Sequence, residues 1–316
     1  MAQVNRHRYR NLIMALTLSV VFVFGACERD LDIDLGDAGG KPVLYAFLQP
    51  DTGLVLSLSK SVSILNETHY DLYQNASVLI YKNGAPLQTL SYPNGEASYS
   101  WPQIKFNAGD SVTFSVFVDG AELASGQTQI PNPVPIESVD TLRVLKKGPS
   151  GLFEMMMRVR VYFTDPLDEA NFYQLILLQK RVVEQSDGSS ATVVDTISIP
   201  KDDALFYNSN QGSSSFETID FQGLFNDQTI SHRPYGIVLY LPVATFDDGE
   251  DVLANQLIFR LYHLNSLYYS FLRAQIIAAS YEGLPIFNPV QAPSNVSNGF
   301  GVVTSLTCSV DTLDVL

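Results

Sequence analysis

The sequence is poor in cysteine, in tryptophan and in positive charge. It contains two cysteines, Cys27 and Cys308, and one tryptophan, Trp101. Lys and Arg number 19 against 33 Asp and Glu, which gives a formal net charge of −14 at pH 7. Proteins that bind nucleic acid neutralise its phosphates with clusters of Lys and Arg, so this balance excludes nucleic acid as a partner. Hydrophobic residues make up 46% of the chain, which excludes global disorder.

Sequence motifs that mark known chemistry are also missing. The chain has no GxSxG, no P-loop, no GxGxxG and no HExxH motif. Its four histidines lie at positions 7, 69, 232 and 263, and none of them has the spacing of zinc ligands, so we expect no metal and no cofactor. His263 follows a predicted strand and is expected at an interface or as a cap. Sugar-binding platforms favour tryptophan, but Trp101 stands alone and is expected in the core.

The first 26 residues have the pattern of a bacterial export signal. Three arginines between positions 6 and 10 precede an apolar stretch, 12–24, that is too short for a permanent membrane-spanning helix. Two small residues then precede Cys27, as in a lipobox, although Phe24 stands where Leu is usual. We therefore expect residues 1–26 to be removed and Cys27 to carry acyl chains that anchor the protein to a membrane.

The segment after Cys27 predicts a tether. Residues 27–40 are acidic and then rich in glycine, which favours a linker that stands off an anionic membrane surface. With Cys27 acylated, Cys308 is the one thiol left, and no disulfide can form within the mature chain. Cys308 lies in an alternating run typical of a strand, so we expect it to be a buried structural thiol.

From residue 41 onward, short runs of β-branched and aromatic residues alternate with turn signals. Those in 41–131 predict an N-terminal β-sandwich of an Ig-like or transthyretin-like kind, with Asn83-Gly84 and Asp119-Gly120 as hairpin turns. The strands expected there are 43–48, 55–61, 76–81, 86–90, 97–101, 111–118 and 122–130.

Prolines 131, 133 and 135 predict a stiff linker, which we take as a domain boundary where the two parts separate. Residues 136–316 predict a second, β-rich domain with one packed helix over 266–281. Its inner face would carry Leu267, Phe271, Ala274, Ala278 and Tyr281, with Asn265 or Ser266 as the cap. The strands expected in this domain are 136–145, 153–164, 172–184, 193–199, 235–245, 256–263 and 302–310.

Several motifs together resemble one known family. They are DLDIDL at 30–35, LSLSKS at 56–61, FTDP at 163–166, NPV at 288–290 and SNVSNGFG at 294–301. The chain resembles the Bacteroidota lipoprotein family catalogued as domain of unknown function 4249 (DUF4249), over essentially its whole mature length. Val302-Val303-Thr304 departs from the Ile-Phe-Gly that is usual after the last motif. The family has no established activity. Its members tend to be encoded beside TonB-dependent outer-membrane receptors, which implies a role in surface uptake or receptor assembly.

The long loop over 289–301 is the feature we single out for function. Long loops on a rigid β scaffold often carry binding, which makes this loop a candidate contact surface for a partner. A structural loop that covers the end of the β core is the favoured interpretation, and the contact surface is the functional one. The candidate contact residues are Pro289, Asn295, Asn298, Gly299 and Phe300.

Two further patterns concern modification and metal binding. Asp-Ser/Thr-apolar triplets, which bacteria of the phylum implied by the resemblance modify with O-glycans, occur four times, with acceptors at Ser111, Thr141, Thr196 and Thr312. Calcium prefers several oxygen ligands on a flexible loop, and one acidic run offers them, but its spacing does not match an EF-hand, so a solvated loop is favoured. The acidic residues of that run are Asp247, Asp248, Glu250 and Asp251.

These patterns and the resemblance together predict a non-enzymatic lipoprotein of the outer membrane, on its periplasmic or cell-surface face. We expect it to be an accessory to a TonB-dependent nutrient-uptake system, acting through protein–protein contact. The alternative is a lipoprotein that binds a glycan, a peptide or a metal chelate directly, and a deep pocket with convergent polar groups would favour it. A hydrolase whose Ser, His and Asp meet only in three dimensions is the third interpretation.

Overall fold

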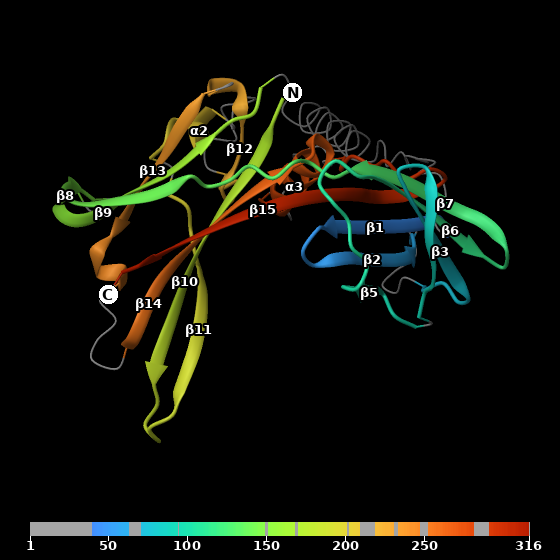
Figure 1. The fold of residues 1–316 in the computed structure, drawn as a ribbon, viewed down its shortest axis with the longest axis horizontal. Helices are drawn as coiled ribbons and strands as arrows, with labels where there is room; N and C mark the ends of the chain where they lie inside the picture. The colour runs from blue at the N-terminus through green and yellow to red at the C-terminus, as the bar shows by residue number, and fades with distance from the viewer. Residues whose placement is uncertain are drawn as a thin grey trace, which may run out of the picture. The chain divides into compact units, whose positions relative to one another are not determined.

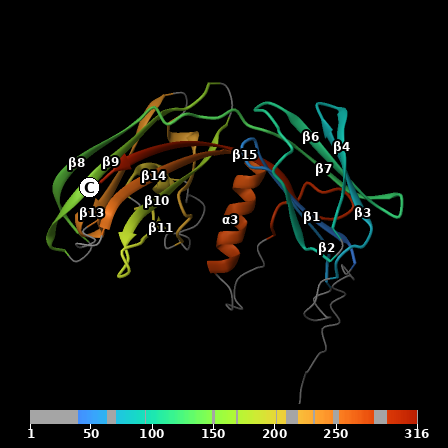
Figure 2. The same cartoon turned by 60° about the horizontal axis from the view of Figure 1, so that its bottom comes forward.

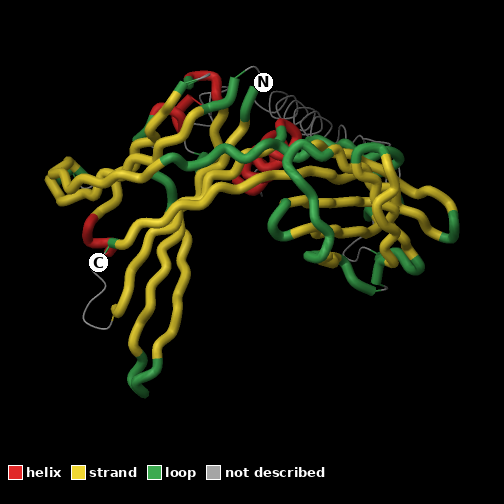
Figure 3. Tube along the Cα trace, viewed as in Figure 1, coloured by secondary structure: helices red, strands yellow, loops and turns green. Residues whose placement is uncertain are grey.

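The structure is a computed structural model, and it describes residues 40–62, 71–93, 95–148, 151–167, 170–200, 202–208, 219–230, 233–246, 252–280 and 291–315. These residues belong to one compact unit, Ala38–Leu316. The described part is mostly β, with several sheets, and it contains two α-helices, α2 (Ala204–Asn208) and α3 (Ser266–Ser280), as Figures 1 and 3 show. The prediction of a mostly β fold with one substantial helix is confirmed.

The first seven strands lie close to the predicted ranges. Alternation explains why: in β1, Leu44, Ala46 and Leu48 are buried, while Tyr45 and Phe47 lie on the opposite face. The strands are β1 (Pro42–Gln49), β2 (Gly53–Lys60), β3 (Ala76–Lys82), β4 (Ala85–Ser91), β5 (Ser98–Trp101), β6 (Ser111–Val118) and β7 (Ala121–Gln129).

The second half of the chain supplies eight more strands. The ranges predicted for β9 and β10 match the structure, whereas α2 and the three-residue β12 were not predicted, because segments this short carry no periodicity. The strands are β8 (Ser138–Lys147), β9 (Phe153–Thr164), β10 (Phe172–Glu184), β11 (Ser190–Ile197), β12 (Leu224–Asn226), β13 (Pro234–Pro242), β14 (Val252–Leu264) and β15 (Phe300–Asp314). Two 3-10 turns cover Asp227–Thr229 and Val243–Phe246.

The last strand belongs to both halves of the fold. The largest sheet has the order β11-β10-β14-β15-β1-β2-β5, with β12 beside β10. The first part of β15 runs parallel to β1, with Leu44 opposite Gly301 and Leu48 opposite Ser305, and its later part pairs with β14. The boundary at 131–135 stays a prediction, but residues 300–305, which the sequence assigned to the second domain, pair with a strand of the first.

Two hydrophobic cores follow from this arrangement. The first is shared by β1, β2 and β5 with the separate sheet β4-β3-β6-β7, and it includes Trp101, as predicted, together with Val303 from β15. The second lies between the sheet β13-β9-β8 and strands β10 and β14, around the buried residues Val161, Phe163 and Tyr173.

Helix α3 packs against elements of both halves (Figure 2). Asn265 caps it, because its Oδ1 accepts a hydrogen bond of 2.8 Å from the backbone N–H of Tyr268. The ring of Phe271 lies 5.8 Å from that of Tyr45 on β1, and the ring of Tyr269 lies 4.9 Å from that of Phe172 on β10.

The buried face of α3 differs from the predicted one. Tyr269, Phe271 and Ala274 are buried, Leu267 is half-buried and Ala278 is exposed, because the helix is contacted on two sides rather than along one stripe. Tyr281 lies outside the described residues. Neither described helix combines the length and the apolar character that a membrane crossing requires.

Candidate functional site

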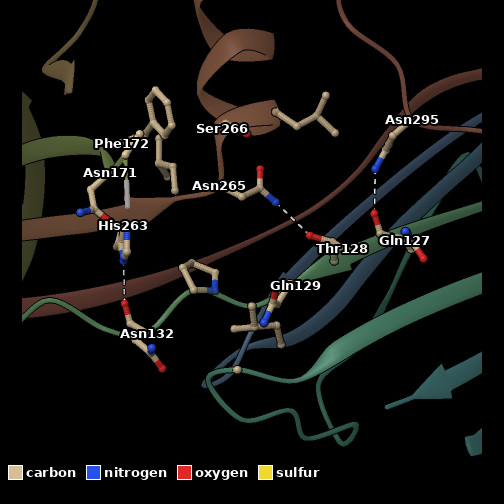
Figure 4. Close-up of a pocket in the computed structure, with 16 residues that line it drawn as sticks. Gln127, Thr128, Gln129, Asn132, Asn171, Phe172, His263, Asn265, Ser266 and Asn295 are labelled. Atoms are coloured by element: carbon tan, nitrogen blue, oxygen red, sulfur yellow. Dashed lines mark hydrogen bonds between the residues drawn. The ribbon is translucent and has the colours of Figure 1, made fainter. Parts of the chain in front are cut away.

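A cavity of about 420 Å³ lies between the end of β7, the proline linker, the segment around Asn295, and the ends of β10, β14 and α3 that face them (Figure 4). Amide side chains dominate its lining, and the described residues that line it include no Asp, Glu, Lys or Arg. The amides are those of Gln127, Gln129, Asn132, Asn171, Asn265 and Asn295.

Asn265 is the hub of the polar network on one wall. Besides capping α3, its Oδ1 accepts a hydrogen bond of 2.9 Å from the hydroxyl of Thr304, and its Nδ2 donates one of 2.9 Å to Oγ1 of Thr128. The Thr128 hydroxyl lies 3.0 Å from that of Ser305, which donates to the carbonyl oxygen of Gln129. One side chain thus ties the start of the helix to β7 and β15, and this wall of the cavity is fixed.

His263 joins the linker to β10 on the opposite wall. Its Nδ1 lies 2.7 Å from the carbonyl oxygen of Asn132, so Nδ1 carries the hydrogen, because a carbonyl oxygen only accepts. Its Nε2 lies 3.1 Å from Oδ1 of Asn171, and its ring stacks on Tyr173 at 5.2 Å. The expected interfacial position of His263 matches this contact between two segments.

Asn295 lines a third side of the cavity, and both polar groups of its side chain form hydrogen bonds within the protein. Its Nδ2 donates to the carbonyl oxygens of Gln127, at 2.8 Å, and of Val303, at 2.9 Å. Its Oδ1 accepts from the backbone N–H of Val303 at 2.8 Å. Both ends of the amide therefore hold the 291–299 segment between β7 and β15, and Asn295 has a structural role.

Other lining groups remain open to a ligand. The side chains of Gln127 and Gln129 are exposed, and neither makes a hydrogen bond to any described residue. Phe172 and Leu267 are half-buried and add apolar surface. The cavity therefore offers a fixed polar frame, free amide groups and a small apolar wall, which suit an uncharged ligand that forms hydrogen bonds.

The other residues of the predicted contact loop lie beyond the cavity. Asn298 has a positive φ of 61°, and Gly299 cannot be replaced easily, because a Cβ there would lie 2.3 Å from the carbonyl oxygen of Pro42. Phe300 is 41% exposed, and the ammonium of Lys41 lies 5.5 Å from the centre of its ring. Pro289 falls outside the described residues.

The remaining predicted sites are spread over the fold. The proposed glycan acceptors are all exposed, although modification itself stays a prediction: Ser111, Thr141, Thr196 and Thr312. Cys308 is half-buried, and burial raises the pKa of its thiol. Cys27 and the acidic candidates for calcium, Asp247, Asp248, Glu250 and Asp251, lie outside the described residues. Within the described part of the chain, no group of three or more His, Cys, Asp or Glu residues is placed to hold a metal ion.

Sequence reasoning missed the cavity, although it had named several of the residues that line it, three of them polar residues with an assigned place. Asn265 was expected as a cap, His263 at an interface and Asn295 in a contact loop, and the structure brings all three to the same cavity. Gln127 and Gln129 gave no signal, because polar residues at alternate positions of a strand are ordinary for a solvent-facing edge.

Comparison with known proteins identifies the family. A family described as Domain of unknown function (DUF4249) matches residues 28–311. Because this match covers most of the chain, the protein belongs to that family. A search of curated proteins finds no match.

Proposed function

We propose that this member of the DUF4249 family is a non-catalytic lipoprotein of the outer membrane, anchored through Cys27, on the periplasmic or cell-surface face. In this proposal it is an accessory to a TonB-dependent uptake system and acts through protein–protein contact. The lipobox pattern before Cys27 and the gene neighbourhood implied by the family support the proposal. We further propose that β1–β7 and β15 form an Ig-like or transthyretin-like sandwich, since two sets of four strands share one core.

The observation that carries the contact proposal is a preorganised surface around Phe300. Asn295 and the paired Ser125 and Ser297 hold the segment that leads to it, with backbone and hydroxyl contacts as short as 2.6 Å. At the end of this fixed segment, Phe300 and Asn298 are exposed. An aromatic side chain on a rigid backbone loses little freedom on binding, which suits it as an anchor of an interface.

The test is crosslinking of the native protein in cells, with Phe300→Ala as the contact variant. Leu87→Ala on β4 is the matched control, because Leu87 is 45% exposed and lies outside the loop. We expect Phe300→Ala to lose a crosslinked receptor that Leu87→Ala retains, with equal melting temperatures. An unchanged crosslink in Phe300→Ala would remove this surface from the proposal, and recovery of no membrane partner at all would remove the accessory role.

The cavity favours direct ligand binding as the second candidate function. Its free amides and its lack of charge among the described lining residues point to a neutral, hydrogen-bonding ligand such as a glycan or a peptide backbone. Calorimetric titration of the native protein with neutral oligosaccharides and short uncharged peptides tests this. Binding that is lost in Gln127→Ala with Gln129→Ala, and kept in Gln88→Ala on β4, would place this function ahead of the accessory role.

A further inference from the structure

One face of the β8–β9 hairpin is apolar, basic and uncovered. Directly opposed residues of an antiparallel pair project to the same side, and the register sets Leu145 opposite Met155 and Lys147 opposite Phe153. Arg143, two residues before Leu145, projects to the same side. We define the β8–β9 face as Arg143, Leu145, Lys147, Phe153 and Met155, with Leu152 at the hairpin end.

The β8–β9 face continues the inner face of its sheet beyond the core. Farther along the same side of β9, Val159 and Val161 are buried in the second core. Toward the hairpin end the side chains become exposed: Leu145 is 65%, Phe153 70% and Leu152 72% exposed. The apolar pattern thus persists after the covering sheet has ended, and contiguous exposed apolar surface of this kind marks an interaction site.

The charge on the face is positive, whereas the protein is acidic. Arg143 and Lys147 are exposed, and neither forms an ion pair with any described residue. The neighbouring cation, Lys146, belongs to the other side of the hairpin, where it lies 2.6 Å from Asp202 and 3.6 Å from the ring centre of Tyr240. Two cations that have no ion-pair partner among the described residues lie beside four apolar side chains, in a chain of net charge −14, and are complementary to an anionic partner.

We propose that the β8–β9 face docks on an anionic lipid surface. Leu152 and Phe153 enter the boundary between headgroups and acyl chains, and Arg143 and Lys147 bind lipid phosphates. This docking needs no acyl group and therefore goes beyond the anchor proposed at Cys27. It would orient the protein on a membrane, which an acyl anchor at a single residue does not do.

Two other occupants fit the face less well. A second copy of the chain in a symmetric contact would bring Arg143 and Lys147 of both copies together, and like charges repel. A partner strand added to the free edge of β8 would meet a strand that carries Arg143, Lys146 and Lys147, and charged side chains on an edge strand oppose such pairing.

The experiment measures vesicle binding of the chain from residue 27 onward with Cys27→Ala, so that no acyl group contributes. Sedimentation compares vesicles that contain phosphatidylglycerol with vesicles of phosphatidylcholine alone. We expect binding only to the anionic vesicles, weakened by salt. Since each basic residue near an anionic surface adds roughly a fivefold gain in binding, Arg143→Glu with Lys147→Glu should bind more than about tenfold more weakly.

Variants of exposed residues keep the test separate from folding. Leu152→Ser with Phe153→Ser should lose binding, while Lys105→Glu and Leu87→Ser, which change an exposed cation and an exposed apolar residue elsewhere, should keep it. Equal binding to neutral vesicles, no binding, or binding unaffected by the face variants would overturn the proposal. Self-association that Phe153→Ser abolishes would assign the face to a second copy. None of these outcomes depends on the receptor crosslink at Phe300, so the two proposals fail separately.

Discussion

Replacing Asn295 with alanine would remove three hydrogen bonds that hold the C-terminal segment to the β scaffold. The largest loss is at the backbone N–H of Val303, which is fully buried and would be left without its side-chain acceptor. A buried donor without a partner costs about 1–3 kcal/mol, and the carbonyl oxygens of Gln127 and Val303 each lose a donor as well. We therefore expect Asn295→Ala to lower the free energy of unfolding by about 2–4 kcal/mol.

Thermal unfolding followed by circular dichroism measures this effect. With an unfolding entropy of about 0.6 kcal/mol/K for a unit of this size, the loss corresponds to a fall in Tm of roughly 3–7 °C. Asn298→Gly is the matched control, because Asn298 is exposed and its φ of 61° suits glycine. The free energy of unfolding of Asn298→Gly should lie within about 0.5 kcal/mol of that of the wild type.

A second substitution tests the reason for the loss. Asn295→Asp keeps an acceptor for the N–H of Val303 but places a carboxylate beside two carbonyl oxygens, so the pKa of this carboxyl in the folded state should be raised. The protonated Asp side chain stabilises the fold fully at a pH below about 4, which is the pKa of Asp in the unfolded chain. This stabilisation is lost as the pH rises through the higher pKa that the same carboxyl has in the folded protein. If Asn295→Ala melts with the wild type, the clamp contributes nothing to stability, and the preorganisation proposed for the surface around Phe300 loses its support.

Four further predictions concern the anchor, the surface, a buried carboxylate and the domain boundary. Cys27→Ala should be released from membranes by high salt, which screens the charge-dependent docking of the β8–β9 face, and retention in salt-washed membranes equal to that of the wild type would contradict acylation. The intact mass should exceed that of the lipidated polypeptide by at least one glycan, and an equal mass would dismiss O-glycosylation. Burial raises the pKa of Asp110, but hydrogen bonds from Lys82 and from the Asn107 N–H outweigh it and hold the pKa below its usual range. The ionised carboxylate of Asp110 therefore stabilises the fold above about pH 4, and this stabilisation is lost as the pH falls. Asp110→Asn should reduce the fall in Tm that the wild type shows at acid pH. A fall in Tm equal to that of the wild type would refute this. A fragment of residues 40–132 lacks β15 and should show no cooperative melting, whereas a folded fragment would support the boundary at 131–135.

The sequence predicted local elements well and their partners poorly. Residues 153–164 and 172–184 are long runs rich in β-branched, aromatic and other apolar residues, so both strands were found with their ends. The cap at Asn265 and the start of α3 followed from local chemistry as well. The parallel pairing of β1 with β15 has no local signal, because its two partners lie near opposite ends of the described chain.

The site was predicted in its residues but not in its geometry. Asn295 was named because asparagine and proline are frequent in loops. That composition does not distinguish a loop residue that holds the chain together from one that contacts a partner. Only the structure separates them, since both ends of its amide bond to the chain itself. The sequence did not predict that the β8–β9 face is exposed. Apolar residues in β9 continue beyond the part of the strand that is buried in the second core. Sequence periodicity shows which residues share a face, but not what covers that face.

The parallel pairing of β15 with β1 has a consequence for how the protein is made. Among the described strands, β1 is the first to be synthesised and its partner β15 is the last. Contacts between residues so distant in sequence form slowly, and an unpaired strand edge invites aggregation while it waits. Until β15 has been synthesised, the first sheet is incomplete. The first sheet is therefore complete only when the fifteen-residue β15 pairs with β1, and until then the edge of β1 is open to pairing with other chains.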